Sequence, residues 1–236
     1  MDLGFQLARA SWPRLLGVAL TVLGCLTPLA AAAAAIAPPL ALLLFWWFKP
    51  TLDRALLHVL ASDLTGRASS VRTILGQRRA WWSGGHLASL TVLRFHPSRS
   101  ARLPIWQLEG LSGSSRRQRV AALAYGDRGG GLLLTLAAVV AEWSLFLSLA
   151  IAFGWLLPTD LTDAFSLTNG TGLDFDHVAT WAAAALIYML TVALVEPFYV
   201  AGGFGLYLNQ RCRLECWDLQ PVLRRIGQRH GGPRAV

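Results

Sequence analysis

Charged residues are scarce in this chain. They make up 14% of its 236 residues, whereas soluble domains usually carry about a quarter. The shortage falls on three long stretches: residues 15–48 hold no charge, residues 129–157 hold only Glu142, and residues 178–208 hold only Glu196. Such stretches argue against an ordinary soluble domain, because a helix needs about 20 apolar residues to cross a membrane.

The apolar stretches also lack the alternation of apolar and polar residues that membrane β-barrel strands show. An example is the sequence GLLLTLAAVVAEWSLFLSLAIAFGWLL, which begins at residue 131. Only helices and closed barrels satisfy every backbone group inside lipid, so the pattern predicts an all-α integral membrane protein. Pro38-Pro39 divides the first stretch, and we therefore expect four transmembrane helices near residues 14–36, 38–60, 130–157 and 177–208.

The uneven distribution of charge predicts how the chain is oriented. Residues 49–130 hold 13 Lys and Arg against 4 Asp and Glu, and residues 209–236 hold 6 against 2. Residues 158–177 hold four aspartates and no basic residue. Because basic loops stay in the cytoplasm, the pattern favours two helical hairpins with both termini cytoplasmic and the aspartate-rich loop outside.

The first apolar stretch allows a second interpretation. Its basic start, apolar middle and Ala-x-Ala sites match the outline of a secretory signal peptide. The next apolar run follows almost at once, which fits a membrane hairpin better.

Cysteine is also scarce. Three residues, Cys25, Cys212 and Cys216, are too few for a disulfide framework. Cys212 and Cys216 have helical spacing, but no histidine or third cysteine lies near them to complete a zinc site. We therefore expect no metal and no cofactor.

We expect four regions along the chain. Residues 1–64 form an N-terminal interfacial helix, with Phe5 and Trp12 as membrane anchors, followed by the first hairpin. Residues 65–129 form an arginine-rich cytoplasmic region, residues 130–210 the second hairpin, and residues 211–236 a cytoplasmic tail. Within the second region, residues 96–104 are predicted to be an irregular loop, and the sequence SGSSRRQRVAALAYG a helix.

An amphipathic helix is predicted from the sequence SSVRTILGQRRAWW, because its apolar and basic residues fall on opposite faces. Such a helix lies in the surface of an anionic membrane leaflet or packs on the protein's own cytoplasmic side, and the sequence does not separate these two alternatives. The predicted lipid-facing residues are Arg72, Arg78, Arg79, Trp81 and Trp82.

Five charged residues fall inside the predicted membrane helices. Charges at this depth are costly, so they usually face the protein interior and pair with one another. We expect Lys49 or Arg54 to pair with Glu196, and Glu142 to face inward to a polar partner or water. The predicted network comprises Lys49, Asp53, Arg54, Glu142 and Glu196. It either sets the register of the helices or forms a path for protons or ions.

The second and fourth predicted spans share a pattern. Each has a charged residue followed by proline, Lys49-Pro50 and Glu196-Pro197, and a helical sequence continues beyond it. Proline removes one hydrogen bond and kinks a helix. The match indicates a repeat of two hairpins about an axis along the membrane normal.

Three segments carry a family resemblance: WWFKPTLDRALLHVLASDLTG, LPIWQLEGLSGSSRRQR and VEPFYVAGGFGLYLNQRCRLECWDLQ. Together they resemble a group of uncharacterised bacterial polytopic membrane proteins, which look related to the membrane domain that accompanies glycerophosphodiester phosphodiesterases. The group is often encoded beside MoxR-type AAA+ ATPases. The resemblance implies an inner-membrane protein and a partner role in a cell-envelope assembly, and it transfers no catalytic residue.

Three functions follow as hypotheses. The first is a non-catalytic membrane component that binds partner helices and anionic lipid; Gly17, Thr21 and Gly24 share one face of the first span, and small residues let helices approach closely. The second is an oligomeric transporter or channel subunit that uses Glu142 and Glu196. The third is an intramembrane enzyme, for which the candidate residues are His58, Asp63, His96 and Glu109. No nucleophile–base spacing links these four residues. The membrane explains the basic charge better than nucleic acid does.

Overall fold

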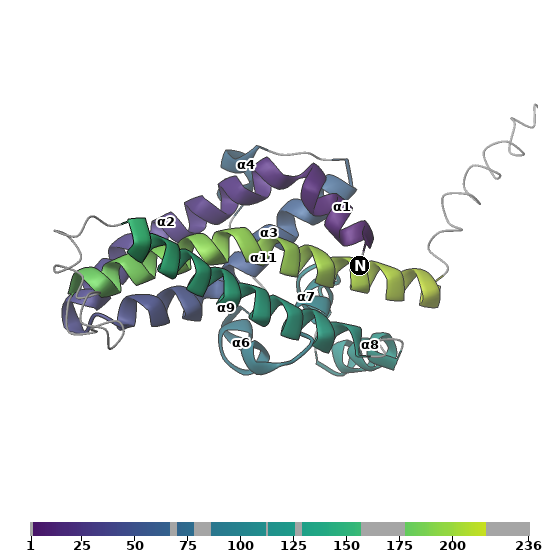
Figure 1. Cartoon of the computed structure of the whole chain (residues 1–236). Helices are drawn as coiled ribbons and strands as arrows, with labels where there is room; N and C mark the ends of the chain where they lie inside the picture. Colours follow the sequence, from purple (N-terminus) through teal and green to yellow (C-terminus); the bar gives the residue numbers. More distant parts are fainter. Residues whose placement is uncertain are drawn as a thin grey trace, which may run out of the picture.

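The chain folds into a bundle of long helices, with shorter helices packed around its middle and toward one end (Figure 1). The structure is a computed structural model and describes residues 2–66, 70–77, 86–111, 113–125, 129–156 and 178–215. Every regular element within these ranges is helical, as predicted. The long helices are α2 (Trp12–Ile36), α3 (Leu40–Leu64), α9 (Gly130–Leu156) and α11 (Val178–Glu215), and the shorter ones are α1 (Asp2–Ala10), α4 (Val71–Gly76), α6 (His86–Leu90), η1 (Val92–Phe95), α7 (Arg99–Gln107) and α8 (Gly113–Tyr125).

In the part of the chain that the structure describes, three helices are long and apolar enough to cross a membrane: α2, α9 and residues Thr180–Leu214 within α11. Helix α3 has the length, but the charges of Lys49, Asp53, Arg54 and Asp63 interrupt its apolar run. Helix α3 follows α2 after a turn at residues 37–39, and both α3 and α11 continue through their internal prolines.

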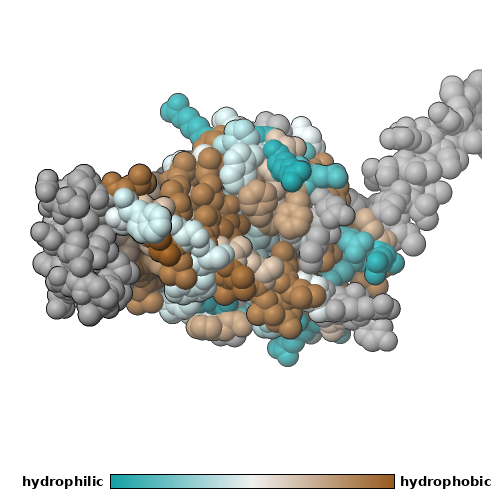
Figure 2. All heavy atoms as spheres, viewed as in Figure 1, coloured by the Kyte–Doolittle hydropathy of each residue, from teal (hydrophilic) through white to brown (hydrophobic). Residues whose placement is uncertain are grey.

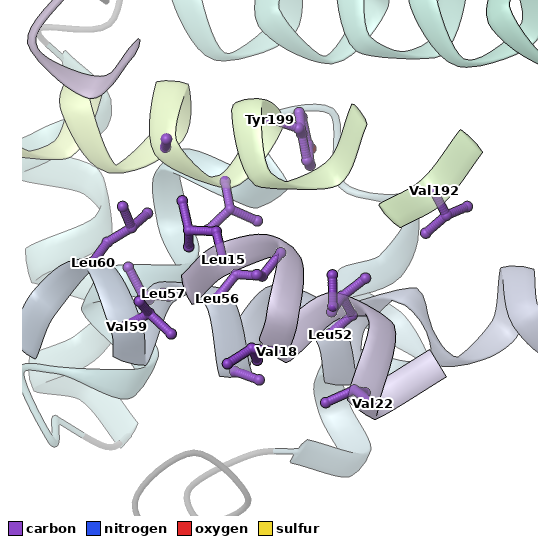
Figure 3. Close-up of a cluster of buried hydrophobic side chains, with 14 of the residues drawn as sticks. Leu15, Val18, Val22, Leu52, Leu56, Leu57, Val59, Leu60, Val192 and Tyr199 are labelled. Carbon is purple, nitrogen blue, oxygen red and sulfur yellow. The ribbon is translucent and has the colours of Figure 1, made fainter. Parts of the chain in front are cut away.

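The hydrophobic core lies where α2, α3 and α11 meet (Figure 3). The second half of α3 is its centre, because nearly every residue from Lys49 to Leu60 is buried. Polar residues of α3 therefore face other protein elements. The close-up labels Leu15, Val18, Val22, Leu52, Leu56, Leu57, Val59, Leu60, Val192 and Tyr199.

Helix α9 buries very little of its surface. Only Gly131, Leu134 and Glu142 of its 27 residues are buried. On the face shown in Figure 2, apolar side chains cover the part of the bundle nearer the α2–α3 turn, and hydrophilic side chains gather toward the end that carries α1 and α8. This division is typical of a protein with one part in lipid and one part in water.

Helix α1 packs against the second half of α11, around Phe198 and Ala201. A side chain on Gly4 would collide with the backbone of Ala201, so the two helices approach to backbone contact. Phe5 and Trp12, predicted as membrane anchors, have their rings 6.4 Å and 5.0 Å from the ring of Phe198. These aromatic residues thus fasten α1 and α2 to α11.

The segment between α3 and α9 differs from its predicted form. The predicted loop at residues 96–104 was wrong from Arg99 onward, because helix α7 begins there and continues through Pro104. The predicted helix after it is confirmed as α8. Helices α6 and α7 pack against α3, and α7 also packs against α11 and α9, so this segment is part of the bundle.

Candidate functional site

A buried ion-pair cluster joins α3, α9 and α11. The ammonium of Lys49, on α3, lies 2.6 Å from a carboxylate oxygen of Glu142, on α9, and 2.9 Å from one of Glu196, on α11. All three residues are at most 9% exposed. Of the two cations that the sequence offered as partners for Glu196, Lys49 takes this position, and Glu142 faces the interior. One ammonium thus connects three long helices.

Two residues that sequence reasoning missed complete the cluster. The guanidinium of Arg99 lies 2.9 Å from Asp53 and 3.0 Å from Glu196. Tyr188 donates a hydrogen bond of 2.7 Å to Glu142. Arg99 was overlooked because its segment was expected to be an irregular cytoplasmic loop, and Tyr188 because an uncharged residue in an apolar run gives no signal.

Arg54 follows Asp53 on α3 and is fully buried. Its guanidinium donates to the hydroxyl of Ser89, on α6, at 3.3 Å, and its carbonyl accepts from the side chain of Gln107, on α7. Arg54 therefore fastens the short helices to α3.

Arg94, on η1, binds the backbone of α3 at Pro50. Proline has no N–H, so the carbonyl of Trp46, four residues before Pro50, loses its helical donor. The guanidinium of Arg94 donates to this carbonyl and, at 2.7 Å, to the carbonyl of Trp47. It also lies 3.5 Å from the ring centre of Trp46. Arg94 therefore satisfies the one carbonyl that the proline leaves free, that of Trp46, and also donates to its neighbour at Trp47.

The two arginines differ in electrostatic environment. Burial opposes the charge of Arg99, but the carboxylates of Asp53 and Glu196 raise its pKa above the ordinary value. Burial, and next the repulsion from Arg99, lower the pKa of Arg94. The direction differs because Arg94 touches carbonyl groups and has no carboxylate within ion-pair distance among the described residues.

A cavity of about 230 Å³ adjoins the cluster. It lies between α3, η1, α7, α9 and α11. Its polar lining comprises Lys49, Arg94, His96, Arg99, Thr135, Glu142, Tyr188, Glu196 and Tyr199, and its apolar lining comprises Trp46, Phe95, Ala138, Val139 and Trp143. A second cavity of about 20 Å³ shares His96 and Arg99 with the first and also touches Asp53. Burial and Arg102 lower the pKa of His96, so this imidazole is neutral at pH 7.

The other predicted site residues lie apart from this cavity. Arg72 is exposed on α4, whose Ile74 is buried against the protein. This contact agrees with packing on the protein's own surface for the described part of the predicted amphipathic helix. Arg78, Arg79, Trp81 and Trp82 lie outside the described residues, as does the aspartate-rich loop.

The candidates for an intramembrane enzyme make separate contacts. His58 bonds Gln77, Asp63 bonds Ser11 and Arg14, and Glu109 bonds Arg119 and Tyr207. Within the described ranges, no three His, Cys, Asp or Glu side chains are grouped as metal ligands. The charged cavity is therefore the candidate site.

Comparison with known proteins gives no assignment. No family model matches the chain, and no match is found among curated proteins or solved structures.

Proposed function

We propose that the chain crosses the bacterial inner membrane four times, through α2, α3, α9 and α11, with both termini in the cytoplasm. The three apolar helices support this placement. Helix α3 is proposed as the fourth crossing because its charged residues face other protein elements. The concentration of Lys and Arg in residues 49–130 and 209–236 supports the orientation.

Cysteine labelling tests this topology. In a variant that lacks the three native cysteines, single cysteines replace Thr168 and Arg225. A membrane-impermeant maleimide should label position 168 from the periplasmic side and position 225 only after the membrane is opened. Labelling of both positions from the same side would contradict the four crossings.

Within that membrane, the chain is proposed to act as a non-catalytic component of a larger cell-envelope assembly. This proposal rests mainly on the exposure of α9, which presents an apolar surface along its whole length and buries only three of its residues. A small-residue face of α2 adds support, since Thr21 and Gly24 are exposed and a side chain on Gly24 would meet nothing within 4 Å. Such faces accept a neighbouring helix. The family resemblance adds an AAA+ ATPase system as a candidate partner.

A pull-down in mild detergent tests the assembly. Val140 on α9 is 67% exposed, and Leu186 on α11 is 55% exposed. Val140→Trp should remove stoichiometric partners if α9 is their contact, because a larger side chain prevents close helix packing. Leu186→Trp is the matched control on a helix that is not proposed to contact partners. A wild-type protein that is purified alone under these conditions would contradict the proposal.

A transporter or channel subunit is the second candidate, favoured by the cavity beside Lys49, Glu142 and Glu196. Proton or cation flux into liposomes, measured with an internal dye, tests it. Flux that depends on the protein and is lost in Glu196→Gln would favour this candidate, and an absence of flux would exclude it.

A further inference from the structure

The larger cavity is lined by more positive than negative side chains. Its lining contains three basic residues, Lys49, Arg94 and Arg99, and two carboxylates, Glu142 and Glu196. With all five ionised, the lining carries one surplus positive charge. An uncompensated charge away from water is costly, so a bound anion would stabilise this arrangement.

The surplus can be assigned to a particular place. Lys49 and Arg99 each contact two carboxylates. Arg94 is 7% exposed and directs its two terminal nitrogens to backbone carbonyls. Its Nε, like that of Arg99, is buried and has no hydrogen-bond partner in the described structure. Both arginines line the larger cavity, so a guanidinium group without its full set of hydrogen bonds lies beside the cavity in each case.

The rim of this cavity is apolar and exposed. Phe95 is 73% exposed, Trp143 59% and Val139 44%. Trp143 and Val139 belong to α9, the least buried of the three apolar helices found in the described residues. On α9 the polar lining of the cavity extends from Thr135, about 8 Å along the helix from Gly130 at 1.5 Å per residue, to Glu142, about 18 Å along it. The cavity thus reaches from near the cytoplasmic headgroup level into the acyl-chain region, and its rim faces acyl chains.

We propose that this cavity binds the phosphodiester headgroup of an anionic membrane lipid, which enters between η1 and α9. The guanidinium groups of Arg94 and Arg99 are the donors to the phosphate oxygens, since guanidinium groups suit phosphate geometry. A phosphodiester has one negative charge, equal to the surplus. The volume of about 230 Å³ corresponds to several water molecules at about 30 Å³ each, so it holds more than the phosphate group itself. The acyl chains extend past the apolar rim into the bilayer.

This inference rests on the proposed membrane crossing, and lipid retention tests it. The full chain is reconstituted in phosphatidylcholine vesicles that contain phosphatidylglycerol, extracted with mild detergent, and weighed with its bound lipid by native mass spectrometry. The wild type should retain a single phosphatidylglycerol. Arg94→Gln should weaken retention about tenfold or more, as expected for the loss of hydrogen bonds to a charged group. Arg117→Gln, at an exposed position of α8, is the matched control and should retain lipid like the wild type.

Arg94 also supports α3, so a second variant separates binding from folding. Ala138→Phe fills the cavity and leaves every charge in place; it should abolish retention while the melting temperature of the lipid-free protein stays near that of the wild type. Retention unchanged in both Arg94→Gln and Ala138→Phe would overturn the site. Displacement of the lipid by millimolar inorganic phosphate would show that the site binds a soluble anion, and it would overturn the assignment of the site to a lipid.

Two failures of the wild type have different meanings. Wild-type protein that enters the vesicles but retains no phosphatidylglycerol would overturn the lipid site and leave the membrane placement intact. Protein that is removed from the vesicles by alkaline carbonate would overturn the membrane placement on which the site depends.

Discussion

Replacement of Lys49 by methionine should strongly destabilise the protein. Methionine retains much of the apolar stem of lysine, so packing in the core changes little, but the ammonium is lost. Glu142 and Glu196 both contact that ammonium, at 2.6 and 2.9 Å. Without it, the two buried carboxylates face each other. Arg99 still pairs with Glu196, whereas Glu142 retains Tyr188.

The expected size follows from this arrangement. Removing one partner of a buried pair costs about 3–5 kcal/mol, because the remaining charge stays buried and uncompensated. For a chain of this length, each kcal/mol lowers the melting temperature by about 2–4 °C, so we expect a decrease of roughly 6–20 °C. Glu142→Gln should lower the free energy of unfolding by less, since the amide oxygen of the glutamine still accepts a hydrogen bond from Tyr188. The double variant with Lys49→Met and Glu142→Gln should be more stable than Lys49→Met alone, because the unpaired carboxylate is gone. The coupling free energy between the two substitutions should be about 1–3 kcal/mol.

Thermal unfolding of the four proteins in one detergent, monitored by intrinsic tryptophan fluorescence, measures these differences. Arg72→Met is the control for the loss of an exposed cation, and its unfolding should match that of the wild type. A melting temperature of Lys49→Met within 2 °C of the wild type, or strictly additive effects of the two substitutions, would refute the buried ion pair.

Two further predictions concern packing and pH. Gly203→Ala should lower the free energy of unfolding by about 1–3 kcal/mol, because the new methyl group meets both the backbone and the Cβ of Ser100 on α7. Gly202→Ala should lower it less, because there the methyl group meets only the flexible end of a leucine, at 2.9 Å. Equal unfolding temperatures of the two variants would contradict this close approach. Burial, followed by Arg54, lowers the pKa of His86 below 6.5, so its contribution to stability is complete above pH 6.5 and decreases as the pH falls below it. His86→Gln should therefore flatten the dependence of melting temperature on pH between 5 and 7, and an unchanged slope would exclude His86 as its source.

Much of the fold could be predicted because the membrane imposes strong constraints on sequence. Apolar length predicted α2, α9 and α11, and Pro38-Pro39 predicted the turn before α3. The cost of intramembrane charge predicted that Glu142 would face inward, where it now contacts Lys49. These inferences need only the local composition of each segment.

The packing of the short helices could not be predicted in this way. Arg94 and Arg99 lie in a segment whose basic charge indicated a cytoplasmic region, yet both lie against the middle of the bundle. Their partners are groups that sequence patterns do not reveal: a carbonyl freed by Pro50, and carboxylates on two other helices. Such contacts depend on tertiary structure, because no periodicity marks a residue that binds the backbone of a distant helix.

The matching charge–proline pairs of α3 and α11 meet at the cluster. Lys49 precedes Pro50, Glu196 precedes Pro197, and these two charges form the ion pair of 2.9 Å. Each proline leaves a carbonyl one turn earlier without its helical donor. In α3 that carbonyl is occupied by Arg94, which also lines the cavity. A proline in a long apolar helix thus leaves a carbonyl that needs a hydrogen-bond donor, and an arginine packed inside the bundle can supply it. The proposed repeat remains a prediction, but this arrangement gives it a physical basis, because two helices altered at the same depth can place opposite charges against each other.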